Sequence, residues 1–421
     1  MSNIRVVRAG WAVLGIWASL CAVGCSSDEP TPKGVASGGV GNAAGDPGVA
    51  SGGASPAGGS GGSDRGGASA GGGAGGAAGA PVSTNPLCPT KGPVVKGTMP
   101  FADGVEIVST ENDARFLAVS EQFVYWANNN VIKRFSVADN SVETVVDRSK
   151  TSFKIQGLAI DDANVYFSES GVSAVAPGPL GVAKAPLDGK SGPISLANEG
   201  PDATASSMAA ITVAAGYVYY LNLRTQEFAR VSVDGGEPTI LVRTVNPSTM
   251  TVAGGFLWFM HPRTNAIDNV HLLRVPIDAV APPADTAPTA TNVPPGAEVI
   301  APVFNYQPTA VSADATHVYY DDEDKVMHVP IAGGTPEIIA QASETDGFLG
   351  KDTTYVGYIV PTKSGVFWDA DSGGCVPVWK SAFDGSGTVS AVHTVNYPAL
   401  LGANGTHLYF SASGQILRVP L

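Results

Sequence analysis

The chain has 421 residues and a formal net charge of −13 at pH 7. This acid excess is opposite to the basic face that nucleic-acid binding requires, and it also disfavours adsorption onto anionic lipid. Composition divides the chain, because 20 of its 52 glycines fall between Gly34 and Gly79 and no Phe, Trp or Tyr occurs between Trp17 and Phe101. Roughly the first 85–100 residues therefore cannot build a core, whereas the remainder is long enough for one large domain.

The N-terminus has the features of an export signal. Arg5 and Arg8 precede an apolar run over residues 9–24, which is too short to span a bilayer comfortably. The run ends at Cys25, in the order Ala22-Val23-Gly24-Cys25. Two interpretations remain open at this point, namely a lipoprotein signal or an ordinary secretory signal with an incidental cysteine.

The sequence around Cys25 resembles the bacterial lipobox, in which small residues precede a cysteine that becomes diacylated. The resemblance implies that residues 1–24 are a signal peptide and that Cys25 is the lipidated N-terminus of the mature chain. Ser26 follows the cysteine, which under the sorting rule of enteric bacteria implies the outer membrane. We therefore expect a lipid-anchored protein of the outer membrane or cell surface, with a periplasm-facing position as the variant, and no contact with the membrane beyond the anchor.

Residues 25–87 are predicted to be a disordered tether that begins at the lipidated cysteine. They are rich in Gly, Ala and Ser with scattered Pro, and such segments behave as flexible coil with an end-to-end distance on the order of 40–50 Å at this length. Of the four cysteines, Cys21 leaves with the signal and Cys25 carries lipid, so Cys88 and Cys375 remain. In an oxidising compartment these two can form a disulfide or stay as two thiols.

Seven aromatic pairs mark the rest of the chain at intervals of roughly 40–60 residues, as in the blades of a β-propeller. A Val or Leu precedes each pair. The pairs are Tyr125-Trp126, Tyr166-Phe167, Tyr219-Tyr220, Trp258-Phe259, Tyr319-Tyr320, Phe367-Trp368 and Tyr409-Phe410. Adjacent residues of a strand point to opposite faces of a sheet, so each pair predicts a sheet that is buried on both faces, as a propeller blade is.

A second mark follows each pair. It is a basic residue that opens a short apolar strand, as in Arg230-Val231-Ser232-Val233, and it is usually followed by Asp-Gly or Gly-Gly. These dipeptides are hairpin turn signals. We interpret the basic residue as a solvated side chain or as one that pairs neighbouring blades.

The last unit stops at its third strand, on Leu421. The lone strand predicted at 104–108 can supply the missing outer strand and close the ring, so that the last sheet has no unpaired edge there. We therefore predict an all-β fold over residues 88–421, a seven-bladed β-propeller closed by an N-terminal strand, with six blades as the alternative.

The repeat resembles the YWTD and TolB-like propeller families, and also uncharacterised propeller lipoproteins. Only Tyr125-Trp126-Ala127-Asn128 approaches the YWTD tetrad, and those families usually have six blades. The resemblance covers residues 101–421. It implies the architecture and does not identify a ligand.

Acidic residues gather in two expected loops between second and third strands, 321–325 and 369–375, which belong to neighbouring units. Carboxylates grouped in this way can hold Ca²⁺, attract a basic partner or remain solvated. The residues of this predicted acidic patch are Asp321, Asp322, Glu323, Asp324, Asp369 and Asp371, with Glu344 and Asp346 on the connection between the units. Two further stretches, 168–182 and 279–296, are predicted to be long loops.

No catalytic residue and no cofactor is predicted. His261 and His271, with Arg263 and Asp268 between them, are the nearest approach to an acid–base group. The favoured function is a non-catalytic binding or scaffold module, monomeric, for a protein or polysaccharide of the cell envelope. The alternatives are an envelope enzyme (a hydrolase, a lyase or a quinone-dependent sugar dehydrogenase) and a component of envelope assembly or transport.

Overall fold

The computed structural model of the chain describes a set of segments that together form one folded unit. They are residues 5–6, 106–110, 114–151, 153–171, 180–199, 208–244, 249–262, 270–282, 293–303, 310–322, 325–341, 355–371, 375–383, 390–396, 400–412 and 415–421. The chain divides into two units, 1–22 with 86–421 and 23–85. The predicted signal peptide apart from residues 5–6, Cys25, the predicted tether and Cys88 all lie outside the described residues.

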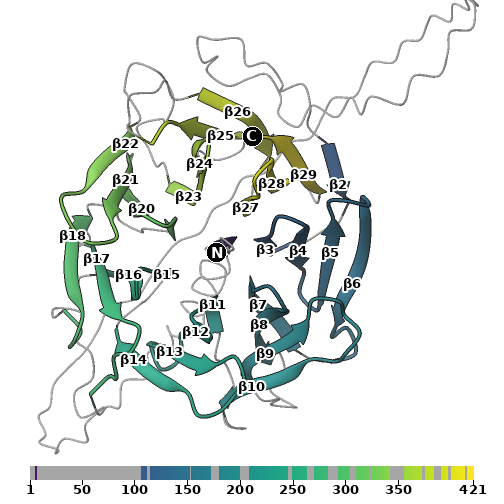
Figure 1. The fold of residues 1–421 in the computed structure, drawn as a ribbon, viewed down its shortest axis with the longest axis horizontal. Helices are drawn as coiled ribbons and strands as arrows, with labels where there is room; N and C mark the ends of the chain where they lie inside the picture. Colours follow the sequence, from purple (N-terminus) through teal and green to yellow (C-terminus); the bar gives the residue numbers. More distant parts are fainter. Residues whose placement is uncertain are drawn as a thin grey trace, which may run out of the picture. The chain divides into compact units, whose positions relative to one another are not determined.

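Seven antiparallel sheets are arranged radially around a common centre (Figure 1). The described residues form strands and no helix. This confirms the predicted all-β, seven-bladed propeller and excludes the six-bladed alternative. Blades 1 to 7 are numbered in chain order, and within each blade the strands run from the innermost, first strand to the outermost, fourth strand.

The two inner strands of every blade carry most of the buried core residues. The first strands are β3 (Phe116–Val119), β7 (Phe153–Ile160), β11 (Met208–Ala214), β15 (Met250–Ala253), β19 (Val311–Ala313), β23 (Tyr355–Thr362) and β27 (Leu400–Ala403). The second strands carry the aromatic pairs and are β4 (Phe123–Ala127), β8 (Asn164–Gly171), β12 (Tyr217–Asn222), β16 (Phe256–Pro262), β20 (His317–Asp322), β24 (Gly365–Asp371) and β28 (His407–Ala412).

The two outer strands carry most of the charged residues. The third strands are β5 (Val131–Ser136), β9 (Leu180–Pro186), β13 (Glu227–Ser232), β17 (Val270–Pro276), β21 (Lys325–Pro330), β25 (Cys375–Ser381) and β29 (Gln415–Pro420). The fourth strands are β6 (Ser141–Asp147), β10 (Ile194–Glu199), β14 (Thr239–Arg243), β18 (Glu298–Val303), β22 (Glu337–Gln341), β26 (Ser390–Asn396) and β2 (Glu106–Ser109).

Blade 7 joins the two ends of the propeller sequence. Strand β2 pairs antiparallel with β29, with Glu106 opposite Arg418 and Ile107 opposite Leu417. The predicted closure by an N-terminal strand is therefore confirmed, two residues further along the chain than expected. A two-residue strand, β1 (Arg5–Val6), pairs with β3 at the inner edge of blade 1.

The aromatic pairs form the core between blades. All fourteen residues are at most 4% exposed. Around the ring, the first residue of each pair packs in one hydrophobic cluster with the second residue of the next pair. Examples are Tyr166 with Tyr220 and Trp258 with Tyr320. Each sheet is thus packed on both faces, which is the arrangement that adjacent aromatic residues on one strand require.

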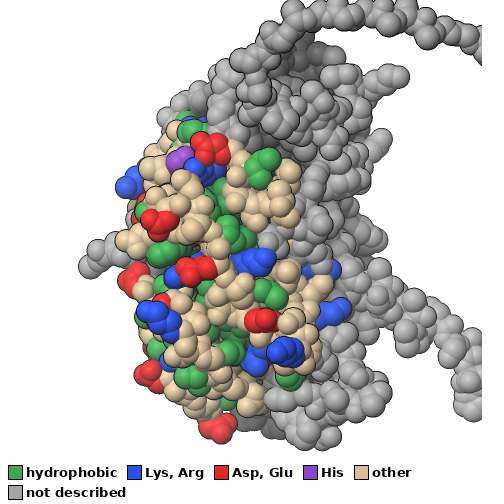
Figure 2. Space-filling view, turned by 90° about the vertical axis from the view of Figure 1, so that its right-hand side faces the viewer, with side chains coloured by type: hydrophobic (Ala, Val, Ile, Leu, Met, Phe, Trp, Pro, Cys, Tyr) green, Lys and Arg blue, Asp and Glu red, His purple; other side chains and the backbone are tan. Residues whose placement is uncertain are grey.

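The outer surface is mixed in character. Figure 2 shows acidic and basic side chains interspersed, with hydrophobic ones placed singly among them. Exposed apolar residues on the fourth strands include Ile107, Val142 and Ile194, one on each of three blades. Scattered apolar residues of this kind are normal on a protein surface.

Candidate binding face

The strand ends of the propeller define two faces. The connections from first to second strands and from third to fourth strands leave one face, here called the turn face. The connections from second to third strands, and those from each blade to the next, leave the other, here called the loop face. The two faces differ in chemistry and in the length of their connections.

On the turn face, the connections between first and second strands are uniform. They contain two residues in blades 3, 4 and 6 and three in the other blades. At 215–216 and 254–255 both residues have positive φ, the geometry of a type I′ hairpin turn, which glycine adopts at little cost. The connections between third and fourth strands are longer, and blade 4 carries its predicted insertion, 279–296, there.

A carboxylate or amide closes the three-residue turns of blades 2, 5 and 7. Asp314 Oδ1 accepts the backbone N–H groups of Thr316 and His317 at 2.6 and 2.8 Å, and its Oδ2 accepts the hydroxyl of Tyr319 at 2.7 Å. Asp161 accepts the backbone N–H of Asn164 and the hydroxyl of Tyr166 in the same way. In blade 7, Asn404 Oδ1 accepts the N–H of His407, and its amide NH₂ group donates to the hydroxyl oxygen of Tyr409 at 3.3 Å. The first residue of the aromatic pair is therefore fastened to its own turn, and these polar atoms are already engaged within the fold.

On the loop face, connection lengths vary widely. Between second and third strands they run from two residues at 323–324 to eight at 172–179, and between blades from three at 397–399 to thirteen at 342–354. The strands extend further into three predicted loops, 168–182, 321–325 and 369–375, than expected. Residues 168–171 and 180–182 belong to β8 and β9, and Asp321, Asp322, Asp369 and Asp371 belong to β20 and β24.

A row of polar residues lies where the second strands reach the loop face. Each stands three positions after the first residue of the aromatic pair, in blades 1 to 5. The residues of this polar rim are Asn128, Glu169, Asn222, His261 and Asp322. All except Asn128 are at most 7% exposed. Aligned on their aromatic pairs, the seven units show this position. Of its members, only His261 and Asp322 are among the residues predicted from the sequence.

Two members of the polar rim hold short loops in place. Asn128 Oδ1 accepts the backbone N–H of Val131 at 2.9 Å, and Asn222 Oδ1 accepts that of Arg224 at 3.0 Å. Because the side-chain oxygen of each asparagine faces the backbone N–H groups of the loop, its NH₂ group points away from them.

Glu169 and Arg148 form an ion pair between blades 1 and 2. Arg148 Nε lies 2.9 Å from Glu169 Oε1, and the carboxylate side chain is 9% exposed. Burial raises the pKa of Glu169, although the guanidinium of Arg148 acts in the opposite direction. Nearby, the Gln156 amide donates to Ser170 Oγ at 2.9 Å. The pair fixes the connection between the two blades at the loop face.

Two described members of the acidic patch, Asp321 and Asp369, serve the backbone. Asp321 is fully buried and its Oδ1 accepts the N–H of Ala310 at 3.0 Å; Asp369 is 2% exposed and its Oδ1 accepts the N–H of Tyr358 at 2.6 Å. Glu323 and Asp324, as well as Glu344 and Asp346, lie outside the described residues, and nothing is described of the side chain of Asp371. The patch as a ligand or metal site stays a prediction.

The predicted acid–base group is only partly described. His261 is 2% exposed, lies opposite His271 in the sheet, and its Nδ1 is 2.5 Å from Thr244 Oγ1. Arg263 and Asp268 lie outside the described residues. Within the described segments, no group of three or more His, Cys, Asp or Glu residues is placed to hold a metal ion.

The repeated basic residue joins neighbouring blades, as one of its two interpretations predicted. It lies opposite the first residue of the aromatic pair in every blade. In blades 1 to 4 it donates a hydrogen bond to a backbone carbonyl of the following blade. These bonds join Arg134 to Leu187, Lys184 to Val233, Arg230 to Ile277 and Arg274 to Ile331.

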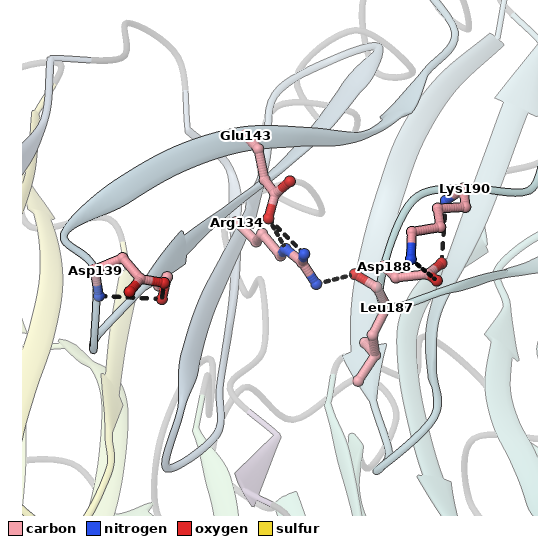
Figure 3. A network of polar contacts seen from close by, with 7 residues as sticks. Arg134, Asp139, Glu143, Leu187, Asp188 and Lys190 are labelled. Atoms are coloured by element: carbon pink, nitrogen blue, oxygen red, sulfur yellow. Dashed lines mark hydrogen bonds and ion pairs between the residues drawn. The ribbon is translucent and has the colours of Figure 1, made fainter.

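Figure 3 shows this contact between blades 1 and 2, where Arg134 reaches both Glu143 of its own blade and the carbonyl of Leu187. Salt bridges of the same kind join Arg274 to Glu298 and Arg418 to Glu106. The ring of basic residues is therefore part of the scaffold.

Cys375 begins β25, and its side chain is not described; its predicted partner Cys88 lies outside the described residues. The predicted disulfide and the predicted lipidation of Cys25 thus stay predictions. Within the described part of the chain there is no helix long and apolar enough to cross a membrane.

Comparison with known proteins identifies no family. No family model matches the chain, and no curated protein matches it. Similar folds occur among solved structures. A nidogen/laminin complex contains a chain with 14% identity and a TM-score of 0.43, covering 65% of this chain and 93% of that one.

Two bacterial structures are similar to the same extent. A putative glucose dehydrogenase-type oxidoreductase from Thermus thermophilus has 14% identity and a TM-score of 0.40, with coverage of 75% of this chain and 99% of that one. PorZ, a surface component of the type-IX secretion system of Porphyromonas gingivalis, has 12% identity and a TM-score of 0.48, with coverage of 73% and 46%. At these values the likeness concerns the propeller fold alone.

Proposed function

We propose that this chain is a lipid-anchored protein of the bacterial cell envelope whose propeller is a monomeric, non-catalytic binding module for protein or polysaccharide. The observation that carries the proposal is the contrast between the two ends of the inner strands. At the turn face the connections between first and second strands contain two or three residues, and those of blades 2, 5 and 7 are closed by their own hydrogen bonds, whereas the connections that leave the inner strands at the loop face range from two to thirteen residues. Variation of loops on a constant scaffold is the usual basis of binding specificity.

The first strands of blades 3 and 4 support binding over catalysis. In blade 3 the first strand includes Ile211-Thr212-Val213-Ala214, and in blade 4 it is Met250-Thr251-Val252-Ala253. Apolar and small side chains with an occasional hydroxyl give these two first strands no acid–base group. An enzyme of the hydrolase, lyase or dehydrogenase type needs such groups from several blades to converge on one centre.

The anchor follows from the sequence around Cys25, together with the Gly-rich tether predicted over residues 25–87. Acyl chains contribute about 0.8 kcal/mol per buried CH₂ group, so a multiply acylated cysteine suffices for stable attachment. Labelling with palmitate tests this directly. We expect incorporation in the wild-type chain and none in Cys25→Ser, which would leave the membrane fraction. Retention of label in Cys25→Ser would contradict the anchor.

Two exposed lysines allow the binding face to be tested. Lys150 lies in the connection from blade 1 to blade 2, on the loop face, and Lys190 lies on the turn face of blade 2. A photo-crosslinking amino acid at position 150, expressed in the native host, should capture an envelope protein or glycan. The same residue at position 190 is the matched control. Equal capture from both positions would overturn the assignment of the face.

A further inference from the structure

A cavity of about 170 Å³ lies between blades 2 and 3. Its walls come from the fourth strand of blade 2 and the second to fourth strands of blade 3, which lie side by side in Figure 1. Ala197, Ala229 and Ile240 supply apolar surface, and Tyr220 supplies an aromatic ring. The cavity lies next to the polar rim, because Asn222 is one of its lining residues.

Three polar side chains of the cavity are each held by the protein through one atom. Ser195 Oγ donates to Asn198 Oδ1 at 2.7 Å. Asn222 Oδ1 accepts the backbone N–H groups of Arg224 and Thr225. These bonds orient both amides, so each NH₂ group is the end left for a ligand.

The third polar side chain is the acceptor of the cavity. Arg243 Nε lies 2.8 Å from Glu227 Oε1, and both side chains are at most 20% exposed. The bond uses one carboxylate oxygen and leaves Oε2 as an acceptor. The ion pair also makes this corner electrically neutral, so neither an anionic nor a cationic ligand gains from it.

We propose that this cavity binds one neutral sugar residue of a polysaccharide. The inference rests on the proposed function and names its ligand class. Two amide donors and one carboxylate acceptor match neighbouring hydroxyl groups, since a hydroxyl can both donate and accept. The apolar walls and the ring of Tyr220 match the C–H surface of a pyranose. The cavity volume fits one such ring, and an extended protein segment would need a longer groove.

The size of the cavity also sets the affinity. A ligand of about 12 non-hydrogen atoms in a site of this size is expected to bind with a Kd on the order of millimolar. A polysaccharide that repeats the same unit would bind more tightly, because the chain presents many copies to one site and rebinding is frequent.

The test is affinity electrophoresis of the full chain, purified in detergent, through gels that contain dextran, galactomannan or xylan. We expect at least one of these neutral polysaccharides to retard the wild-type protein. Asn198→Trp, at an exposed position on the cavity rim, should block the cavity and abolish retardation. Glu227→Gln should weaken binding about tenfold, because it removes a charged acceptor. Gln415→Ala is the matched control, since Gln415 begins the third strand of blade 7 as Glu227 does in blade 3.

The outcomes separate this inference from the proposed function. Retardation that survives both Asn198→Trp and Glu227→Gln would overturn the sugar site and leave a polysaccharide-binding propeller. Absence of retardation on all three gels, with capture of an envelope partner from position 150, would overturn the sugar site and leave the loop face. Absence of both would overturn both proposals. Thermal unfolding of each variant shows whether it is folded, and Glu227→Gln keeps the side-chain volume should Asn198→Trp fail.

Discussion

At the scale of single residues, the turn carboxylates are the polar groups on which the blades depend most. One carboxylate oxygen of Asp314 accepts the two backbone N–H groups of the turn, and the other accepts the hydroxyl of Tyr319. Burial acts to raise the pKa of Asp314, but the backbone N–H groups of Thr316 and His317 and the hydroxyl of Tyr319 outweigh it, so the pKa lies below its ordinary value. The ionised form is therefore the stabilising one.

We expect Asp314→Ala to lower the free energy of unfolding by about 1–2 kcal/mol at pH 7, because it leaves two backbone N–H groups and one hydroxyl without an acceptor. Asp314→Asn should cost less, since Asn404 makes the same turn in blade 7. The measurement is urea unfolding between pH 3 and pH 7. The pKa of Asp314 is lower in the folded protein than in the unfolded chain. The stabilisation by its carboxylate is therefore complete above the unfolded-state pKa and is lost as the pH falls through the folded-state pKa. Wild type and Asp314→Ala should therefore converge in acid, and parallel curves would contradict the account.

His328 is the exception in the ring of basic residues. In blade 5 it occupies the place that Arg274 has in blade 4, stacks on His317 at a centroid distance of 4.7 Å, and lies 3.4 Å from Glu337. Burial lowers its pKa, more than Glu337 raises it. The folded protein thus prefers neutral His328, and protonation favours the unfolded chain.

We expect the free energy of unfolding to fall as the pH decreases from the ordinary histidine pKa of about 6.5 toward the lower pKa that His328 has in the folded protein. In His328→Arg the charge is permanent, so this part of the pH dependence should disappear. The measurement is the unfolding midpoint at several pH values between 5 and 7.5. His407→Gln serves as a comparison, because burial also lowers the pKa of His407. If the unfolding midpoint of His328→Arg depended on pH as that of the wild type does, His328 would not be the group responsible.

At the scale of strands, the aromatic pairs predicted the fold, because two adjacent aromatic residues on one strand can both be buried only if the sheet is packed on both faces. The recurrence of the basic residue with that pair predicted a repeated role but left two interpretations open, a solvated side chain or blade pairing, and the structure shows blade pairing in blades 1 to 4. The role of Asp321 and Asp369 could not be foreseen, because their partners, the N–H groups of Ala310 and Tyr358, come from the first strand or the residue before it. A short acidic run gives no sign of whether it lies in a loop or at a strand end.

The inter-blade contact predicts a graded series at one position. Arg274 is 9% exposed, bonds Glu298 and the carbonyl of Ile331, and lies over the ring of Phe256 at 4.3 Å. Arg274→Met should keep the packing of the stem but leave both acceptors without a donor, at a cost of about 2–3 kcal/mol.

Arg274→Lys should cost less than Arg274→Met, because Lys184 makes the equivalent bond in blade 2, to the carbonyl of Val233 at 2.7 Å. Urea unfolding at neutral pH distinguishes the two variants. Equal losses in Lys and Met would mean that the salt bridge to Glu298, and not the bond to the next blade, carries the stability of this site.

At the scale of the whole molecule, the ring and its closure were predictable from the count of repeats and the unfinished last unit. The polar rim and the cavity between blades 2 and 3 were not. Glu227 and Arg243 begin and end different strands, and Asn198 belongs to another blade, so the cavity exists only after blades have packed. Sequence reasoning finds sites made of neighbouring residues far more readily than sites shared between repeats.

The closure strand β2 offers the last prediction. Val108 is partly buried against the cluster that joins blades 7 and 1, whereas Ile107, its neighbour on the same strand, is 55% exposed. Ile107 lies opposite Leu417, whereas Val108 lies at the register shift between Ile107 and Ser109, and only Val108 contacts the cluster. Val108→Asp would place a charge against that cluster, so we expect β2 to detach from β29 and the free energy of unfolding to fall by about 2–3 kcal/mol. Ile107→Asp should change it by less than about 0.5 kcal/mol. Amide hydrogen exchange in β29 is the measurement, with faster exchange expected in Val108→Asp alone. If both variants exchanged at the wild-type rate, the N-terminal strand would not be what holds the ring shut.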